Sequence, residues 1–106
     1  VGEFRRVLDG GEVTDVISNR VIGHLGDLSI SGLMLICPHP PESGAIHQFR
    51  LPLYNADARA HLVEIGVQSL WHRAAANPGQ TRAGFRIIAI SDSHAAILHN
   101  WLALPD

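Results

Sequence analysis

Apolar and polar residues alternate along much of the chain, with the two-residue period of a half-buried β-strand. The alternation is clearest in residues 46–53 and returns in residues 63–71 and 83–89. Side chains two positions apart point to the same face of a strand. The predicted inward faces hold His47, Phe49, Leu51, Leu53, Val63, Ile65, Val67, Trp71, Ala83, Phe85, Ile87 and Ala89.

Three shorter apolar segments come before these strands. Residues 12–18 and 21–26 are rich in valine and isoleucine, and residues 33–37 are wholly apolar, as expected of a buried strand. Turn-forming residues separate the segments. They are Asn19 and Arg20, then Pro38, Pro40, Pro41 and Gly44, and finally Asn77, Pro78 and Gly79.

The period changes to that of a helix after Ile90. Ser91 offers an N-cap oxygen, and Asp92 places a carboxylate in the first turn. Apolar residues then share one helical face, which we expect to pack over one end of the strands through Trp101. Several short strands followed by one helix indicate a mainly β fold, a barrel or a sandwich. The aromatic residues predicted for its core are Phe49, Trp71, Phe85 and Trp101.

Composition limits the partners of this fold. The chain has 106 residues, enough for one domain, and a net charge of −2. All eight cations are arginines, and the even balance of charge argues against binding to duplex DNA and disfavours a barrel for single-stranded nucleic acid. No apolar run is long enough to cross a bilayer, and no signal-peptide pattern opens the chain. We therefore expect no membrane insertion and a cytoplasmic location.

The residues do not predict an enzyme or a metal site. Cys37 is the only cysteine, so it forms no disulfide within the chain, and we expect it to act as a small apolar residue. The seven histidines lack the spacing of metal ligands. A triad of His24, Asp27 and Ser29 lacks the sharp elbow that a nucleophilic serine needs. No catalytic residue, metal ligand or cofactor is predicted.

A short polar motif precedes the wholly apolar strand. It reads Asp27-Leu28-Ser29-Ile30-Ser31-Gly32. Aspartate supplies acceptors, serine supplies a donor and an acceptor, and glycine permits a bend or a close backbone approach. Asp27 and Ser29 fit two roles equally well, reading the edge of a polar ligand or capping a turn of the chain itself. Gly32 fits a bend in either case.

The motif and the order of elements resemble the PilZ domain family. The motif matches the family pattern Asp/Asn-x-Ser-x-x-Gly, and the segments 67–71 and 84–85 are similar to the family's later strands. The resemblance implies a small antiparallel β-barrel of about six strands with one C-terminal α-helix. It also implies a bacterial regulatory domain that binds the second messenger cyclic di-GMP through Arg5, Arg6, Asp27, Ser29 and Gly32.

The chain departs from the family at its start. The family's Arg-x-x-x-Arg segment is incomplete, since Arg5 and Arg6 are adjacent and Val1 and Gly2 stand four residues before them. We predict an arginine-bearing arm over residues 1–11 and a barrel domain over residues 12–106. Two functions are consistent with this departure. The first is a cyclic di-GMP receptor that signals to a partner protein or neighbouring domain. The second is an adaptor that does not bind cyclic di-GMP and instead binds protein in pilus, flagellar or exopolysaccharide machinery. Arg5 and Arg6 fit two roles equally well, contact with a ligand or a solvated terminal tail.

Overall fold

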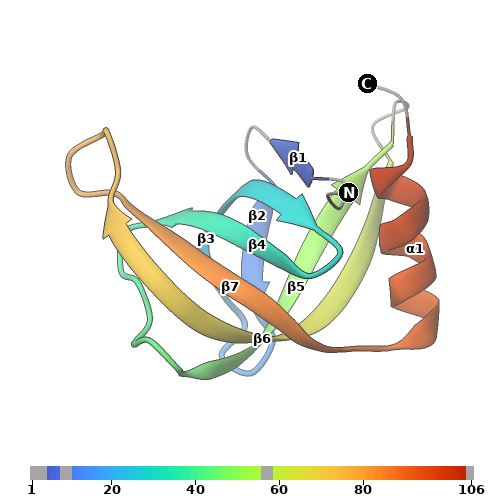
Figure 1. Cartoon of the computed structure of the whole chain (residues 1–106), viewed down its shortest axis with the longest axis horizontal. Helices are drawn as coiled ribbons and strands as arrows, with labels where there is room; N and C mark the ends of the chain where they lie inside the picture. The colour runs from blue at the N-terminus through green and yellow to red at the C-terminus, as the bar shows by residue number, and fades with distance from the viewer. Residues whose placement is uncertain (1–4, 8–10, 56–58, 105–106) are drawn as a thin grey trace.

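The computed structural model describes residues 5–7, 11–55 and 59–104, and for residues 5–7 it describes the backbone alone. Strands make up most of this part of the chain, and a single helix follows them (Figure 1). The elements are β1 (Arg5–Val7), β2 (Glu12–Asp15), β3 (Arg20–Ser29), β4 (Gly32–Cys37), β5 (Ile46–Tyr54), β6 (Ala60–Ala74), β7 (Thr81–Ile90) and α1 (Asp92–Leu102).

Six of the strands close into an antiparallel barrel. The strand order is β1-β3-β2-β5-β6-β7-β4. An additional pairing of β3 with β4 closes the ring of six strands from β3 to β4. The first part of β3 pairs with β2, and its second part pairs with β4. β1 adds to β3 beyond the point where β2 ends, outside the closed ring. The prediction of a mainly β fold with a six-stranded barrel and a C-terminal helix is confirmed.

The alternating faces predicted from the sequence form the core. Phe49, Leu51 and Leu53 of β5 are fully buried, and so are Val63 and Val67 of β6. Burial of each such side chain contributes about 1.5–3 kcal/mol to folding. The rings of Phe49 and Phe85 meet edge to face across the barrel, with their centres 5.0 Å apart.

The prediction that Trp71 lies in the core is wrong. The register between β6 and β7 shifts between Ser69 and Trp71, so one extra residue enters β6. Such a bulge moves every later side chain to the other face. Ser69, just before the bulge, is buried with Val63 and Val67, while Trp71, just after it, keeps 38% of its surface exposed on the outside. A second shift near Gly66 similarly leaves Ala89, which was also predicted to face inward, exposed.

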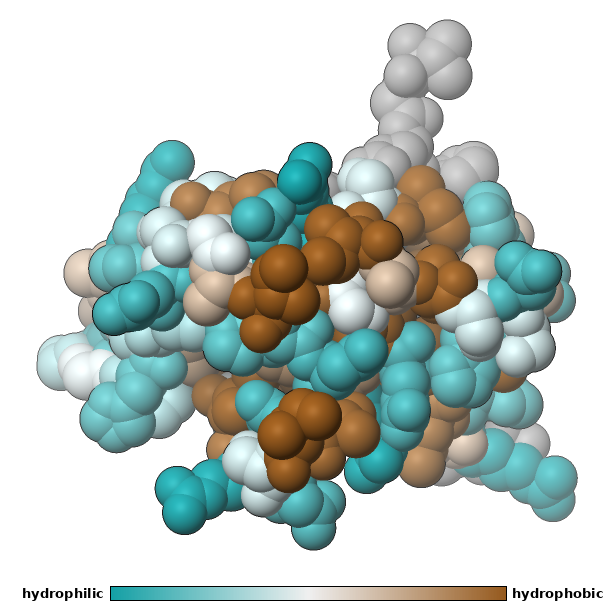
Figure 2. Space-filling model, turned by 90° about the horizontal axis from the view of Figure 1, so that it is seen from below, coloured by the Kyte–Doolittle hydropathy of each residue, from teal (hydrophilic) through white to brown (hydrophobic). Residues whose placement is uncertain are grey.

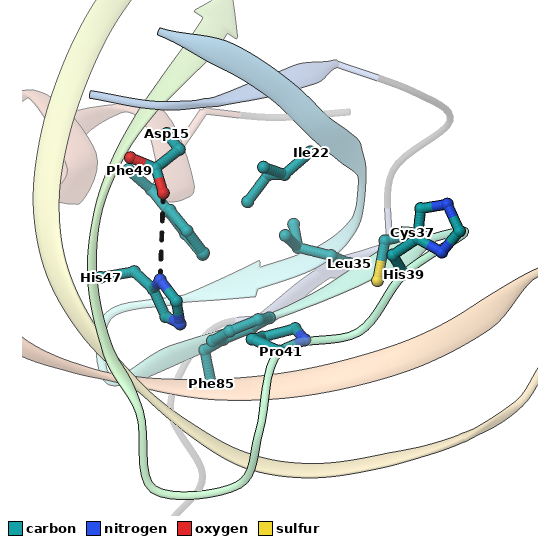
Figure 3. Close-up of a pocket in the computed structure, with 9 residues that line it drawn as sticks. All are labelled: Asp15, Ile22, Leu35, Cys37, His39, Pro41, His47, Phe49 and Phe85. Carbon is teal, nitrogen blue, oxygen red and sulfur yellow. Dashed lines mark ion pairs between the residues drawn. The ribbon is translucent and has the colours of Figure 1, made fainter. Parts of the chain in front are cut away.

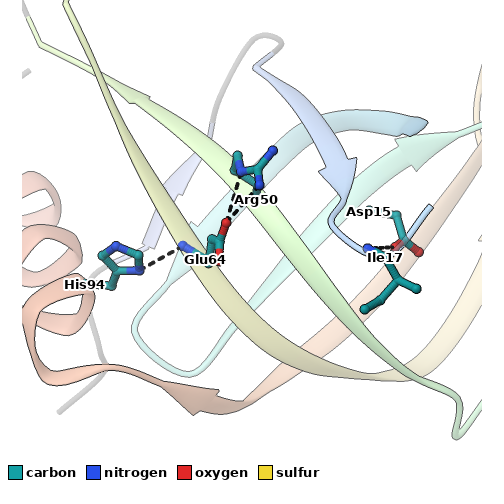
Figure 4. A network of polar contacts seen from close by, with 5 residues as sticks. All are labelled: Asp15, Ile17, Arg50, Glu64 and His94. Atoms are coloured by element: carbon teal, nitrogen blue, oxygen red, sulfur yellow. Dashed lines mark hydrogen bonds and ion pairs between the residues drawn. The ribbon is translucent and has the colours of Figure 1, made fainter. Parts of the chain in front are cut away.

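The first strand of the barrel is shorter than predicted because a side chain ends it. One carboxylate oxygen of Asp15, Oδ1, accepts hydrogen bonds from the backbone N–H groups of Ile17 at 2.8 Å and Ser18 at 3.2 Å (Figure 4 draws the first). These bonds turn the chain back on itself. Asn19 completes the turn with a φ of 58°, a conformation that asparagine tolerates better than most residues. The next strand begins at once and extends to Ser29.

The helix packs where the sequence predicts. The N-cap Ser91 accepts a hydrogen bond from the backbone N–H of His94. Figure 1 shows α1 at one end of the barrel, where Trp101 is buried and donates its indole N–H to the carbonyl of Tyr54 at 3.0 Å. The backbone N–H of Glu64 donates to Nδ1 of His94 at 3.1 Å (Figure 4). No helix in the described part of the chain is long and apolar enough to span a bilayer.

Candidate functional site

The Asp27–Gly32 motif forms the tight connection between β3 and β4. Ser29 ends β3 and Gly32 begins β4, so only Ile30 and Ser31 lie between the two strands. The hydroxyl of Ser29 is buried, accepts a hydrogen bond from the N–H of Gly32 and donates one to its carbonyl, both at 3.2 Å. The serine thus fastens the turn. Direct contact between Ser29 and a ligand stays a prediction, whereas support of the turn is a role that its bonds already show.

Gly32 is required by close packing rather than by backbone conformation. A Cβ atom added at this position would lie 2.5 Å from the carbonyl oxygen of Phe85 in β7. That atom belongs to the backbone, so no side chain can move aside to admit it. The carbonyl of Ser31 also accepts a hydrogen bond from the N–H of Ile87 at 2.8 Å. The turn is therefore held against β7 at two neighbouring residues, by the hydrogen bond at Ser31 and by the close packing at Gly32.

The arginine-bearing arm lies beside this motif. β1 pairs antiparallel with the end of β3, with Arg5 opposite Ser29, Arg6 opposite Leu28 and Val7 opposite Asp27. The side chains of residues 5–7 lie outside what the structure describes, and so do residues 1–4 and 8–10 of the arm as a whole. The backbone pairing still brings together the two segments that the sequence predicts to share a ligand.

A groove runs from the motif across the outer surface of the barrel. Its volume is about 310 Å³. Asp27, which is half-buried, and Gly32, which is buried, line one part of it. Trp71, Arg82 and Arg86 line another part, on the neighbouring strands β6 and β7. The groove thus combines a carboxylate, an aromatic ring and two guanidinium groups. This combination suits a ligand with hydrogen-bond donors, flat rings and negative charge.

Sequence reasoning missed the part of the groove on β6 and β7. Arg82 and Arg86 alternate with the buried Ala83 and Phe85, so their outward direction is readable from the pattern. Their nearness to Asp27 is not, because it depends on the pairing of β7 with β4. The bulge that exposes Trp71 has no clear signal in the sequence.

A second hollow lies inside the barrel wall and has a different character. It holds about 90 Å³ and is lined mainly by apolar side chains, with Phe49 and Phe85 among them (Figure 3). His47 stacks on Phe49 here, and its Nδ1 lies 3.9 Å from a carboxylate oxygen of Asp15. Burial raises the pKa of the Cys37 thiol, which disfavours the reactive thiolate.

Neither hollow gathers metal ligands. Within residues 5–7, 11–55 and 59–104, no three His, Cys, Asp or Glu side chains are close enough to hold a metal ion. The pocket at His47 is also much smaller than the outer groove, and no arginine is among the residues that line it. The groove next to Asp27 is therefore the better candidate for a charged ligand.

Comparison with known families agrees with this architecture. A model of the PilZ domain matches residues 4–104. The chain belongs to the PilZ domain family. PilZ domains are regulatory and receptor domains. No curated protein matches the sequence.

Two solved structures share this fold at low sequence identity. One is the inhibitor of motility MotI/DgrA of Bacillus subtilis, with a TM-score of 0.78 and 9% identity over 96% of this chain. This chain spans 48% of that protein's length. Another is the PilZ domain of YcgR from Escherichia coli with c-di-GMP, with a TM-score of 0.68 and 15% identity over 96% of this chain and 88% of the other.

Proposed function

We propose that this PilZ domain is a receptor for cyclic di-GMP that binds the nucleotide in the outer groove and signals to a partner protein or neighbouring domain. The observation that carries the proposal is the pairing of β1 with the end of β3, at the rim of a groove lined by Asp27, Arg82 and Arg86. The PilZ domain of YcgR, whose structure contains c-di-GMP, supports the choice of ligand.

The groove offers what each part of the nucleotide requires. A carboxylate such as Asp27 can accept hydrogen bonds from N1 and N2 of guanine. An arginine fork can donate to O6 and N7 of the same base, and guanidinium groups pair well with phosphate. Arg5 and Arg6 supply such groups from the arm, on the strand that pairs next to Asp27. Ser29 and Gly32 contribute by fixing the turn against which the ligand would lie.

Calorimetric titration with cyclic di-GMP tests this assignment. We expect saturable binding by the wild-type domain, and a loss of about tenfold to a hundredfold in affinity for Asp27→Ala, since a charge-assisted hydrogen bond contributes about 1.5–3 kcal/mol. Asp92→Ala is the matched control because Asp92 is exposed on α1, outside the groove. Absence of heat at high micromolar nucleotide would refute the receptor assignment, and equal affinities of the two variants would refute the role of Asp27.

An adaptor that binds protein without nucleotide is the second candidate, and the outer surface favours it in one respect. Large apolar side chains are exposed at separate points of the outer surface: Ile46 on β5, Leu62 on β6 and Ile88 on β7. Figure 2 shows apolar residues gathered in patches between polar ones on the face that it views. Exposed apolar patches often mark surfaces that bind other proteins. An affinity pull-down with the immobilised domain tests this candidate. It is supported if the domain does not bind nucleotide, retains a protein partner on the resin, and no longer retains that partner when Ile88→Glu is introduced.

A further inference from the structure

The turn between β2 and β3 presents Ile17 to solvent. Its side chain keeps 84% of its surface exposed, more than any other large apolar side chain in the described part of the chain. Single exposed apolar residues are common on proteins, so exposure alone does not identify a binding surface. The surroundings of Ile17 therefore decide whether it has a partner.

The backbone of this turn is held firmly by hydrogen bonds. Besides the two bonds that the Asp15 carboxylate accepts, the N–H of Val16 donates to the carbonyl of Gln48 at 2.9 Å. The N–H of Asn19 donates to the carbonyl of Asp15 at 2.7 Å. A side chain on a fixed turn is pre-organised, so Ile17 loses little backbone freedom when it binds.

The pocket at His47 lies next to this turn. One oxygen of the Asp15 carboxylate, Oδ1, accepts the N–H of Ile17, while the other, Oδ2, lies 3.9 Å from Nδ1 of His47 (Figure 3 and Figure 4). Asp15 and Ile22, on the two strands that the turn connects, both line the pocket. Exposed His39 lines it as well, so the hollow reaches the surface. The exposed isoleucine and the opening therefore lie on the same side of the molecule.

The volume of the pocket limits what it can hold. Sites for small-molecule ligands and cofactors usually measure about 300–1,000 Å³, and an apolar cavity of about 150 Å³ accommodates benzene. The pocket at His47 holds about 90 Å³, and Leu35, Phe49 and Phe85 are among its walls. One branched aliphatic side chain fits this size and character, whereas a nucleotide does not.

Opposite charges accompany the isoleucine and the pocket. Arg20 is exposed at the end of the turn that carries Ile17, and Glu42 is exposed beside Pro41, which lines the pocket. Neither charged side chain forms an ion pair with another residue that the structure describes. The turn thus offers an apolar group with a cation, and the pocket offers an apolar opening with an anion. Because the two surfaces are complementary to each other, a second copy of the same chain matches both.

We propose that this side of the barrel is a self-association surface, on which Ile17 of each copy enters the pocket at His47 of the other. Arg20 of one copy then faces Glu42 of the other. Because the isoleucine and the pocket lie on the same side, the contact is reciprocal and closes with two copies instead of growing into a fibre. The proposal is independent of the proposed function, since it requires no nucleotide.

Analytical ultracentrifugation of the domain without nucleotide tests the proposal. The surface is small, so we expect a weak dimer with a Kd of about 10 µM to 1 mM. Ile17→Ser should raise this Kd by about a hundredfold or more, because both copies lose the buried side chain. Leu62→Ser is the matched control, since Leu62 is also exposed but follows His61 beside α1, and it should leave the Kd within about twofold. Both variants should keep the melting temperature of the wild-type monomer, because neither position is buried.

A change in the wall of the pocket tests whether the isoleucine enters it. Ile22 is half-buried in that wall, so Ile22→Phe narrows the hollow while Ile17 stays intact. We expect the Kd of the dimer to rise by about tenfold or more, because the incoming side chain is no longer buried. Ile22→Val, which leaves the hollow open, is the matched control and should stay close to the wild type.

Reversal of the two charges tests the orientation of the copies. Arg20→Glu places like charges opposite each other and should raise the Kd by roughly twofold to thirtyfold at low salt, and by less at high salt. Adding Glu42→Arg to Arg20→Glu should restore the wild-type Kd, because opposite charges then face each other again. A double variant as weak as Arg20→Glu would overturn the contact between Arg20 and Glu42.

Three results would overturn the self-association surface as a whole. The first is a wild-type domain that stays monomeric up to about 1 mM. The second is a dimer that Ile17→Ser and Leu62→Ser weaken equally, since that dimer uses another surface. The third is a dimer that Ile17→Ser weakens and Ile22→Phe does not, since the isoleucine then binds outside the pocket. None of these results bears on nucleotide binding, so the receptor assignment is decided separately by calorimetry.

Discussion

Phe49→Ala is expected to destabilise the domain by about 3–5 kcal/mol, the usual cost of truncating a buried phenylalanine. Phe49 is fully buried and packs against the ring of His47 on its own strand and that of Phe85 on β7. Its removal would also enlarge the 90 Å³ pocket that it lines. Because a domain of this size has a total stability of about 5–15 kcal/mol, the variant should keep only a small margin. The midpoint of thermal unfolding should fall by roughly 15–30 °C.

Urea unfolding followed by circular dichroism measures this effect. Phe49→Leu retains most of the volume and should cost less than about 2 kcal/mol. Leu70→Ala is the surface control, because Leu70 is exposed on β6 and should change stability by less than about 1 kcal/mol. A Phe49→Ala variant as stable as Leu70→Ala would show that the centre of the core lies elsewhere.

The barrel could be predicted because its burial follows the simple period of a strand. In β5, the alternation from His47 to Leu53 depends only on neighbouring residues, and the structure confirms it. The helix is equally local, since Ser91 caps it and Trp101 lies on its apolar face. Where a bulge interrupts the period, the same rule fails. Trp71 follows such a bulge, and the rule places it on the wrong side of the sheet.

Contacts between distant strands were beyond the reach of sequence patterns. The Asp27–Gly32 motif was found from its residue types, but the inward hydrogen bonds of Ser29 follow from the tight turn between β3 and β4. The three residues of β1 are too few to show a period, and they become a strand because the edge of β3 is open beyond β2. Arg82 joins the groove because β7 pairs with β4. The residue types of the motif could therefore be identified from the sequence, whereas the groove around it could be located only in the structure.

Gly32→Ala should damage both the fold and the groove. The added methyl group would meet the carbonyl oxygen of Phe85 at 2.5 Å, and the clash can be relieved only if β4 and β7 move apart at their first pair. Overpacking of this kind costs about 1–3 kcal/mol. The movement would also disturb the bonds between Ser29 and Gly32 that hold Asp27 at the rim of the groove. We expect the affinity for cyclic di-GMP to fall by about tenfold or more, because a correctly placed charged hydrogen bond is lost.

Gly66→Ala is the matched control for this substitution. Gly66 also lies inside a strand, but its added methyl group would first meet the side chain of Ala89, at 3.1 Å, and Ala89 lies exposed on the surface of β7. At 3.1 Å the Ala89 backbone needs to move by only a few tenths of an ångström, far less than the 2.5 Å contact at Gly32 demands, so stability and nucleotide affinity should change much less than in Gly32→Ala. Urea unfolding and calorimetry on both variants make the comparison. If Gly32→Ala retains wild-type affinity while losing stability, the turn does not position the ligand, and the glycine serves only the packing of β4 against β7.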